Sequence, residues 1–157
     1  MGPSRCLLCH KAKETMGHLL DNCEFSSLLW DKGAQTFKRS NRVRGYPDLS
    51  IREWDSGAFD NPVILNIWQM LSRITLWNIW KERNNRIFRG NRLEPVEFWR
   101  KIVVNIQETI RSKQWDETER KLLASDRRIA VGWDLTMADL LGLCFKYKIC
   151  HPLSPSL

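Results

Sequence analysis

The chain of 157 residues has no uninterrupted apolar stretch that is long enough to cross a bilayer. Its most apolar segment runs from Val63 to Trp80, whereas a transmembrane helix needs roughly 20 consecutive apolar residues. Polar side chains interrupt this segment at Asn66, Gln69, Arg73 and Asn78. We therefore expect no membrane span and no membrane partner.

The first residues, Met1 to Arg5, lack the apolar core of a secretory signal. The five cysteines are odd in number, and three of them cluster with a histidine before residue 24. Such a cluster favours metal binding in a reducing compartment over a disulfide framework. We therefore expect an intracellular protein of the nucleus or cytoplasm that is not secreted.

The sequence also lacks a recognisable catalytic constellation. Acidic residues occur at Asp116-Glu117-Thr118-Glu119, at Asp134 and at Asp139, without a nearby histidine or glycine-rich loop. General acid–base chemistry needs such a partner within reach. We therefore expect that the protein is not an enzyme.

The composition, 43% hydrophobic and 27% charged, is that of a globular chain. Eight tryptophans imply either a large buried aromatic area or an exposed aromatic surface that can bind a partner. Twenty-five basic residues against 18 acidic ones leave a formal net charge of +7, which favours anionic partners such as RNA or DNA.

Residues 61–90 show the clearest helical pattern. Asn61 can cap a helix and Pro62 suits its first turn, while Gly90 suits its C-terminal end. Apolar residues recur between them at steps of three and four. The members of this stripe are Ile64, Ile67, Trp68, Leu71, Ile74, Trp77 or Asn78, and Trp80 or Lys81.

A second helix is expected from Pro95, with a break past Trp115 before Leu122-Leu123. Its predicted apolar face consists of Trp99, Ile102, Val103, Ile106 and Ile110. A further helix is expected over 136–147. With little strand patterning, the chain is predicted to be mainly α: a small zinc-stabilised N-terminal module followed by a helical body. The predicted divisions are a zinc-binding module at 1–37, a basic connector at 38–60, a helical region at 61–150 and a frayed tail at 151–157.

The cysteine cluster has the pattern Cys6-x2-Cys9-x8-His18-x4-Cys23. Two cysteines separated by two residues present both sulfurs to one ion, and a later histidine and cysteine complete the tetrahedron that Zn²⁺ prefers. Four protein ligands leave no open position for a substrate. The pattern therefore predicts one structural zinc ion bound by Cys6, Cys9, His18 and Cys23.

Alternatives remain open for these residues. His10 competes with His18 as the fourth ligand, although a ligand directly beside Cys9 would form a strained chelate. Free buried thiols with an ordinary surface histidine would give the same pattern without any metal. Cys144 and Cys150-His151 lack a fourth ligand, so we expect ordinary thiols there.

Two segments resemble the reverse-transcriptase zinc-binding region of plant LINE-type (non-LTR) retroelements. The first comprises Cys6-Leu7-Leu8-Cys9, residues 18–25 (HLLDNCEF) and Leu29-Trp30. That family has a Cys-x2-Cys knuckle, a His-Leu-Leu/Phe-x2-Cys stretch and a Phe-x4-Trp continuation. The second segment, residues 77–88, resembles the Trp-x2-Trp-Lys-x-Arg-Asn-x-Arg-x-Phe stretch that follows in the same polyproteins. Together the segments cover residues 6–90 in the family's order.

The resemblance implies an accessory zinc-binding region that helps a polymerase to engage template RNA or target DNA. Its zinc ligands correspond to Cys6, Cys9, His18 and Cys23. The paired aspartates of a reverse transcriptase and the acidic set of a ribonuclease H are not found among these residues. The resemblance therefore implies a non-catalytic, retrotransposon-derived remnant or domesticated fragment.

Two basic clusters are candidates for contact with phosphates, and tyrosine or tryptophan side chains lie near each of them. They comprise Lys38, Arg39, Arg42 and Arg44 in the connector, and Lys81, Arg83 and Arg86 in the helical region. Binding to RNA or DNA through them would be weakly sequence-specific, because phosphate contacts do not identify bases. A solvated basic surface is the alternative for these residues. For the whole protein, the alternative is a protein–protein interaction module that docks a partner through Trp-rich helical faces and has a purely structural zinc site.

Overall fold

The computed structural model describes residues 5–38 and 59–125. This part of the chain is mainly helical, as predicted, and an isolated bridge between Arg5 and Lys13 is its only extended pairing. The elements follow in the order η1 (His18–Asn22, one π-helical turn), α1 (Glu24–Thr36), α3 (Pro62–Phe88), α4 (Pro95–Ser112) and α5 (Glu117–Ser125).

The predicted start and end of the longest helix, α3, are confirmed. The Asn61 side chain accepts hydrogen bonds from the backbone N–H groups of Val63 and Ile64, at 3.0 and 3.4 Å, and Pro62 occupies the first turn. Gly90 adopts a left-handed conformation with φ of +65°, which ends the helix at low steric cost.

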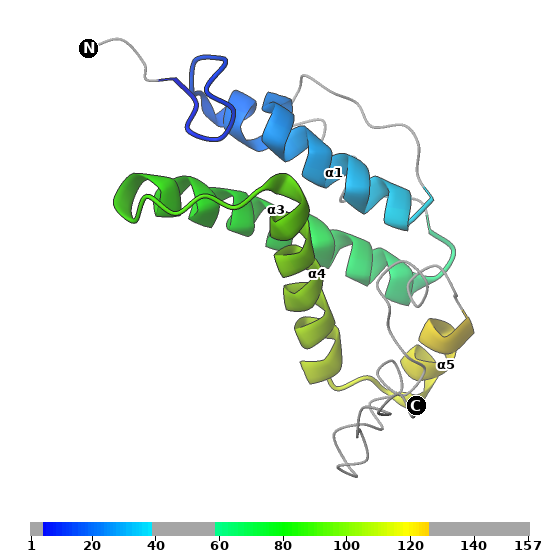
Figure 1. Ribbon diagram of the computed structural model, residues 1–157. Coiled ribbons are helices and arrows are strands. Elements are labelled where there is room, and N and C mark those ends of the chain that lie inside the picture. Colours follow the sequence, from blue (N-terminus) through cyan, green and yellow to red (C-terminus); the bar gives the residue numbers. More distant parts are fainter. Residues whose placement is uncertain (1–4, 39–58, 126–157) are drawn as a thin grey trace, which may run out of the picture.

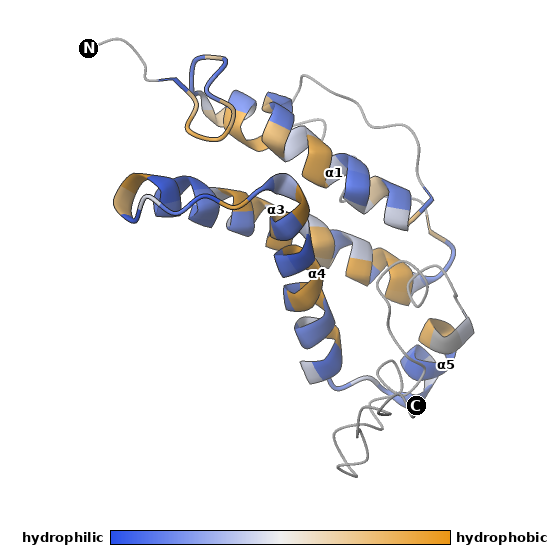
Figure 2. Cartoon of the chain, viewed as in Figure 1, coloured by the Kyte–Doolittle hydropathy of each residue, from blue (hydrophilic) through white to orange (hydrophobic). Residues whose placement is uncertain are grey.

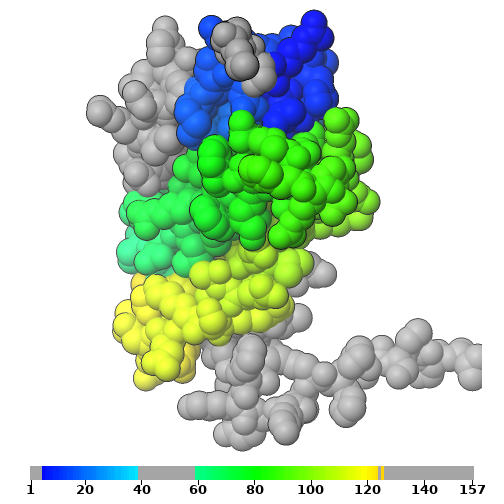
Figure 3. Space-filling model, turned by 90° about the vertical axis from the view of Figure 1, so that its left-hand side faces the viewer, coloured from blue at the N-terminus to red at the C-terminus, as the bar shows by residue number. Residues whose placement is uncertain are grey.

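The helices α1, α4 and α5 and the turn η1 all pack against α3. Figure 1 shows α1 running beside α3 in the opposite direction, while α4 crosses α3 steeply and α5 lies near the first turns of α3. Because α1 also contacts α4, the N-terminal residues are packed onto the helical body. Figure 3 shows this directly, with the blue N-terminal residues lying against the green surface of α3.

One apolar core joins the N-terminal residues to the three later helices. Phe25, Leu29 and Trp30 of α1 share it with Ile64 and Ile67 of α3, among others. Figure 2 shows hydrophobic and hydrophilic residues alternating around each helix, as expected for helices with one buried face. The segment with the Cys and His cluster is therefore covered by the helical body on one side.

The buried faces differ from the predicted ones at the end of α3 and at the start of α4. On α3, Asn78 is buried and Trp77 is 61% exposed, which decides between the two alternatives at that step. At the next step Trp80 and Lys81 are both exposed, and Ile79 is fully buried instead. On α4, Phe98 is fully buried and Trp99 only partly so, because the ring of Phe98 packs against Phe25 at a centroid distance of 5.4 Å. Ile102, Ile106 and Ile110 are buried as expected.

A break follows α4 as predicted, but it begins earlier than expected: α4 ends at Ser112 and α5 starts at Glu117, so Trp115 lies within the break. The backbone leaves the helix at Lys113, and the Trp115 indole donates a 2.8 Å hydrogen bond to the Ile110 carbonyl. Asp116 and Glu119 then cap α5 reciprocally, each side chain accepting from the other's backbone N–H. These two carboxylates therefore have a structural partner in the first turn of α5.

Several predictions concern residues outside the described ranges. They are the contacts of Arg39, Arg42 and Arg44, the helix over 136–147, the thiols of Cys144 and Cys150, and the tail. Within the described part of the chain, none of the helices combines the length and the apolar character needed to cross a membrane.

Candidate metal centre

The first two sulfurs lie on a tight turn between residues 5 and 13. The Cys6 N–H donates to the Ala12 carbonyl, and the His10 N–H donates to the Cys6 carbonyl, both at 2.8 Å. His10 closes the turn with a φ of +56°, a left-handed conformation that histidine adopts more readily than most residues. This turn, which we call the knuckle (residues 6–10), presents Cys6 and Cys9 on the same side.

Of the other two candidate ligands, His18 begins the π-helical turn η1 and Cys23 directly follows it. Thr15 precedes this turn: its hydroxyl accepts from the His18 N–H at 3.1 Å and its carbonyl from the Leu19 N–H at 2.8 Å. The Cys23 N–H donates to the His18 carbonyl at 2.6 Å, after which Cys23 becomes the N-cap residue of α1. The wider π-helical turn thus sets the separation between His18 and Cys23.

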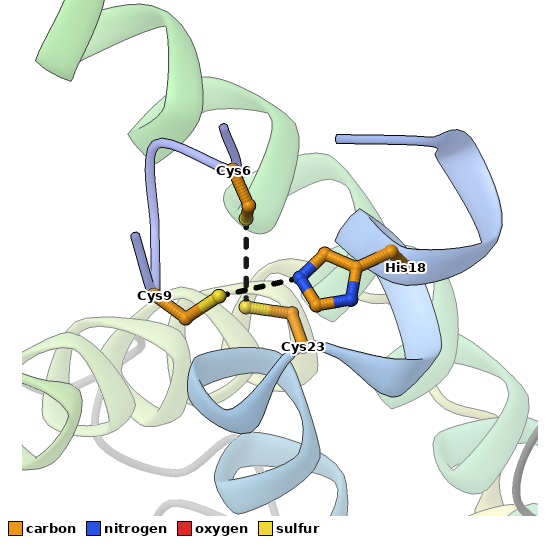
Figure 4. Close-up of side chains that lie close together, drawn as sticks. All are labelled: Cys6, Cys9, His18 and Cys23. Atoms are coloured by element: carbon orange, nitrogen blue, oxygen red, sulfur yellow. Dashed lines mark hydrogen bonds between the residues drawn. The ribbon is translucent and has the colours of Figure 1, made fainter. Parts of the chain in front are cut away.

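The side chains of Cys6, Cys9, His18 and Cys23 converge on one point, as Figure 4 shows. Their ligand atoms all lie within 4.8 Å of one another. The Cys6 and Cys23 sulfurs are 3.7 Å apart, and the Cys9 sulfur is 3.3 Å from Nε2 of His18. The residues that the sequence pattern predicted therefore lie together and can hold a metal ion.

These separations fit a tetrahedral metal. With Zn–S bonds of about 2.3 Å and Zn–N bonds of about 2.0–2.1 Å, a regular tetrahedron places two sulfurs about 3.8 Å apart and a sulfur and a nitrogen about 3.6 Å apart. The observed 3.7 and 3.3 Å are close to both values. The donor set itself, with three sulfurs and one imidazole nitrogen, is one of the usual structural zinc sets.

The electrostatic surroundings differ between the sulfurs. Burial opposes ionisation of Cys9, but hydrogen bonds from the Lys11 backbone and from His18 outweigh it and lower the pKa of Cys9 to about 6. Burial of Cys23, with repulsion from the neighbouring Cys6, raises the pKa of Cys23 to about 12. The positive charge of a bound dication would stabilise all three thiolates. Metal binding would therefore displace the protons of Cys6, Cys9 and Cys23.

Two carbonyl groups of the π-helical turn accept hydrogen bonds from side chains of α1. The Ser26 hydroxyl donates to the Leu19 carbonyl at 2.5 Å, and the Trp30 indole donates to the Leu20 carbonyl at 2.7 Å. Ser26 and Trp30 are both buried. They attach the segment that carries His18 to α1 and so fix the position of one ligand.

Arg86, in the last turn of α3, binds the backbone of the knuckle through hydrogen bonds. Its guanidinium donates to the carbonyls of Leu7 and Leu8, the two residues between the first pair of cysteines, at 3.1 and 3.0 Å. It also donates to the Leu93 carbonyl at 3.1 Å and to the Glu82 carboxylate at 2.8 Å. The Arg86 side chain is only 7% exposed and that of Glu82 only 1%.

Arg83 makes a second connection from α3 to the knuckle. It pairs with Glu14 at 2.8 Å, and the other oxygen of Glu14 accepts from the Leu7 N–H at 3.2 Å. We call Arg83, Arg86 and their carboxylate partners Glu14 and Glu82 the arginine clamp. The clamp joins the knuckle to the end of α3 by both a backbone N–H and two backbone carbonyls.

The arginine clamp changes the prediction that Arg83 and Arg86 contact phosphates. The four hydrogen bonds of Arg86 described above all go to groups of this chain, and its guanidinium lies over the Phe25 ring at 4.8 Å. A buried guanidinium that satisfies internal carbonyls cannot also neutralise an external phosphate. Arg86 is therefore removed from that set, while Arg83, at 24% side-chain exposure, keeps one face toward solvent.

Of the remaining predicted residues, Lys38 and Lys81 are exposed, and Arg39, Arg42 and Arg44 lie outside the described ranges. His10 is exposed and is not in the converging group. Glu14 and Glu82, the carboxylate partners in the clamp, were not among the predicted site residues. The i, i+4 spacing of Glu82 and Arg86 is the one local signal for this pair. Comparisons of the chain with family models, with curated proteins and with solved structures find no match.

Proposed function

We propose that Cys6, Cys9, His18 and Cys23 bind one structural Zn²⁺ that fixes the N-terminal segment onto the helical body. The convergence of their four ligand atoms within 4.8 Å carries this proposal. Thiolate and imidazole ligands suit Zn²⁺, whereas Mg²⁺ and Ca²⁺ take oxygen ligands. Four protein ligands leave no position for a substrate, so the role we propose is non-catalytic.

Purified protein is expected to contain about one zinc ion per chain by elemental analysis. Cobalt exchanged into the site should show the strong visible absorption of a tetrahedral ion with thiolate ligands, because Co²⁺ adopts the geometry that the ligands impose. The Cys144→Ser variant, which changes a thiol outside the ligand set, should retain both signals. A metal content far below one per chain in the wild type would contradict the proposal.

We further propose that the protein associates with RNA or DNA in an accessory role, as the resemblance to retroelement zinc-binding regions implies. The charge distribution on α3 supports this. Between Asn61 and Leu93 the only acidic residue is Glu82, which is buried in the arginine clamp, whereas Arg73, Lys81, Arg89 and Arg92 are exposed. The exposed charges of α3 itself are therefore all basic, which suits a phosphate backbone.

Binding to a mixed-sequence oligonucleotide should weaken at least tenfold between 50 and 200 mM salt, because each phosphate contact releases counterions. The Lys81→Gln variant should reduce the slope of log K against log salt by about one, with little dependence on sequence. Fluorescence anisotropy over a salt series measures both effects. A flat salt profile, or no binding at low salt, would argue against nucleic-acid association.

A second function, a protein–protein interaction module, is favoured by one observation. Trp77 is 61% exposed and Phe88 is 79% exposed, at different places on α3. Exposed aromatic side chains of this size are enriched at protein interfaces. Under this alternative the zinc ion has the same structural role, and partner binding would respond little to salt.

A further inference from the structure

An open apolar groove lies between the N-terminal segment and the middle of α3. Its volume is about 450 Å³, large enough for a planar ring system. One wall comes from the residues on either side of the ligand His18, and the other comes from the outer face of α3. The lining residues are Met16, Leu20, Arg73, Leu76, Trp77 and Trp80.

The groove combines exposed aromatic surface with positive charge. Trp77 and Met16 are the most exposed of its large apolar side chains, at 61% and 60%. Arg73 lies one helical turn before Trp77, and the guanidinium of Arg83 lies 5.6 Å from the ring centroid of Trp80 on the other side. No carboxylate lines the groove.

We propose that this groove binds single-stranded RNA or DNA by stacking an unpaired base on Trp77 while Arg73 contacts the adjoining phosphate. The inference rests on the nucleic-acid association proposed above and assigns it a site. A tryptophan beside an arginine on a surface without carboxylates offers the two contacts that single strands use, a stacking platform and a cation. A duplex keeps its bases paired and cannot make the first contact.

Charge favours a nucleic acid over a protein helix in this groove. Arg73 and Lys81 lie one helical turn before and one turn after Trp77 on α3, and both are exposed. An apolar helix seated on Trp77 would leave these two cations without partners. The lining offers apolar area and one cation but no set of hydrogen-bonding groups that could identify a base. The groove should therefore tolerate any base, with a preference set only by stacking strength.

The metal centre positions one wall of the groove. Met16 and Leu20 are each two residues from His18, and the Leu20 carbonyl is held by the Trp30 indole. Removal of the metal should therefore open the groove and weaken single-strand binding. Phosphate contacts from α3 alone would be less affected.

The test uses fluorescein-labelled oligo(dT) and oligo(U) of 20 nucleotides, with a duplex of the same length, titrated with the zinc-loaded full chain. Trp77→Ala should weaken single-strand binding about tenfold, the effect of losing one stacked base, and leave duplex binding unchanged. Arg73→Gln should lower the salt slope by about one. The matched control is Phe88→Ala, which removes an even more exposed aromatic on α3 outside the groove.

The possible outcomes separate the two proposals. Salt-dependent binding that is the same in Trp77→Ala, Phe88→Ala and wild type would overturn the groove and leave nucleic-acid association standing. Absence of binding in the wild type would overturn both. Concentration-dependent self-association in sedimentation experiments that Trp77→Ala abolishes, without an effect on oligonucleotides, would assign the groove to protein contact instead. Circular dichroism of each variant confirms that the helices are intact.

Discussion

Removal of zinc is expected to detach the N-terminal segment and lower the thermal stability of the whole chain. Structural zinc in finger peptides contributes an apparent binding free energy of about 10–16 kcal/mol at pH 7. This is comparable to the entire unfolding free energy of a typical domain, about 5–15 kcal/mol. Because α1 shares its core with α3 and α4, its release would expose Phe25, Leu29 and Trp30 together with their partners.

The Cys23→Ser variant isolates the contribution of the metal. The Cys23 side chain makes no cap hydrogen bond to α1, and serine is among the best N-cap residues, so the substitution should not weaken the start of α1 while one proposed ligand is lost. We expect the zinc content to fall well below one per chain, and hydrogen exchange to become fast over residues 5–23. The wild type treated with a chelator should show the same exchange pattern, and Cys144→Ser should not.

Lower pH should act in the same direction as the chelator, because protons compete with the metal for the thiolates and the imidazole. The transition temperature of the zinc-loaded protein should therefore fall as the pH falls, while the metal-free protein shows a smaller change. An unchanged transition temperature after complete zinc removal would contradict a structural role for the metal.

The convergence of the four Cys and His residues and the long helices could be predicted because their determinants are local. Cys6 and Cys9 lie within one turn, and the spacing to His18 and Cys23 is short enough for one ion to collect all four. Asn61, Pro62 and Gly90 mark the ends of α3 by capping and by backbone preference, which act over one turn. These features require no knowledge of how the helices pack.

The arginine clamp could not be predicted in this way. Arg86 contacts carbonyls that are 78 and 79 residues away in the sequence, so its burial depends on the packing of α3 beneath the knuckle. The sequence alone does not show which of the two cations Lys81 and Arg86, near the end of the predicted helix, is buried. The structure distinguishes them, because Glu82 and Phe25 surround only Arg86.

The clamp also gives a physical reason why two separated motifs occur together. The segment 77–88 that resembles the retroelement pattern supplies Arg83 and Arg86, and both arginines attach to the knuckle that carries Cys6 and Cys9. The cysteine motif supplies the candidate ligands, and the arginine motif holds the backbone that carries Cys6 and Cys9. Without the arginines, the proposed zinc site would lose this support.

Arg86→Met is expected to destabilise the fold by about 3–5 kcal/mol, the usual effect of removing one member of a buried ion pair. The Glu82 carboxylate would stay buried without its cation, and the carbonyls of Leu7, Leu8 and Leu93 would lose a donor. Zinc affinity should fall as well, since outer-shell hydrogen bonds orient metal-binding residues. Denaturant unfolding and competition with a zinc chelator measure the two effects.

Arg89→Met is the matched control, because Arg89 lies three residues further along and is exposed. We expect this variant to lose less than about 0.5 kcal/mol of stability, as for most surface substitutions, and to keep its zinc affinity. Equal stability and zinc affinity in Arg86→Met and Arg89→Met would show that the contacts of Arg86 contribute nothing to the centre.

The double variant Glu82→Leu/Arg86→Met separates the ion pair from the hydrogen bonds to the knuckle. If only the pair mattered, replacing both charges by apolar side chains would restore most of the lost stability, because buried pairs often exchange neutrally with apolar groups. Each unsatisfied buried carbonyl costs about 1–3 kcal/mol, however, and neither new side chain donates to the carbonyls of Leu7 and Leu8. We therefore expect the double variant to recover stability relative to Arg86→Met but not zinc affinity. Recovery of both would locate the role of Arg86 in charge neutralisation alone.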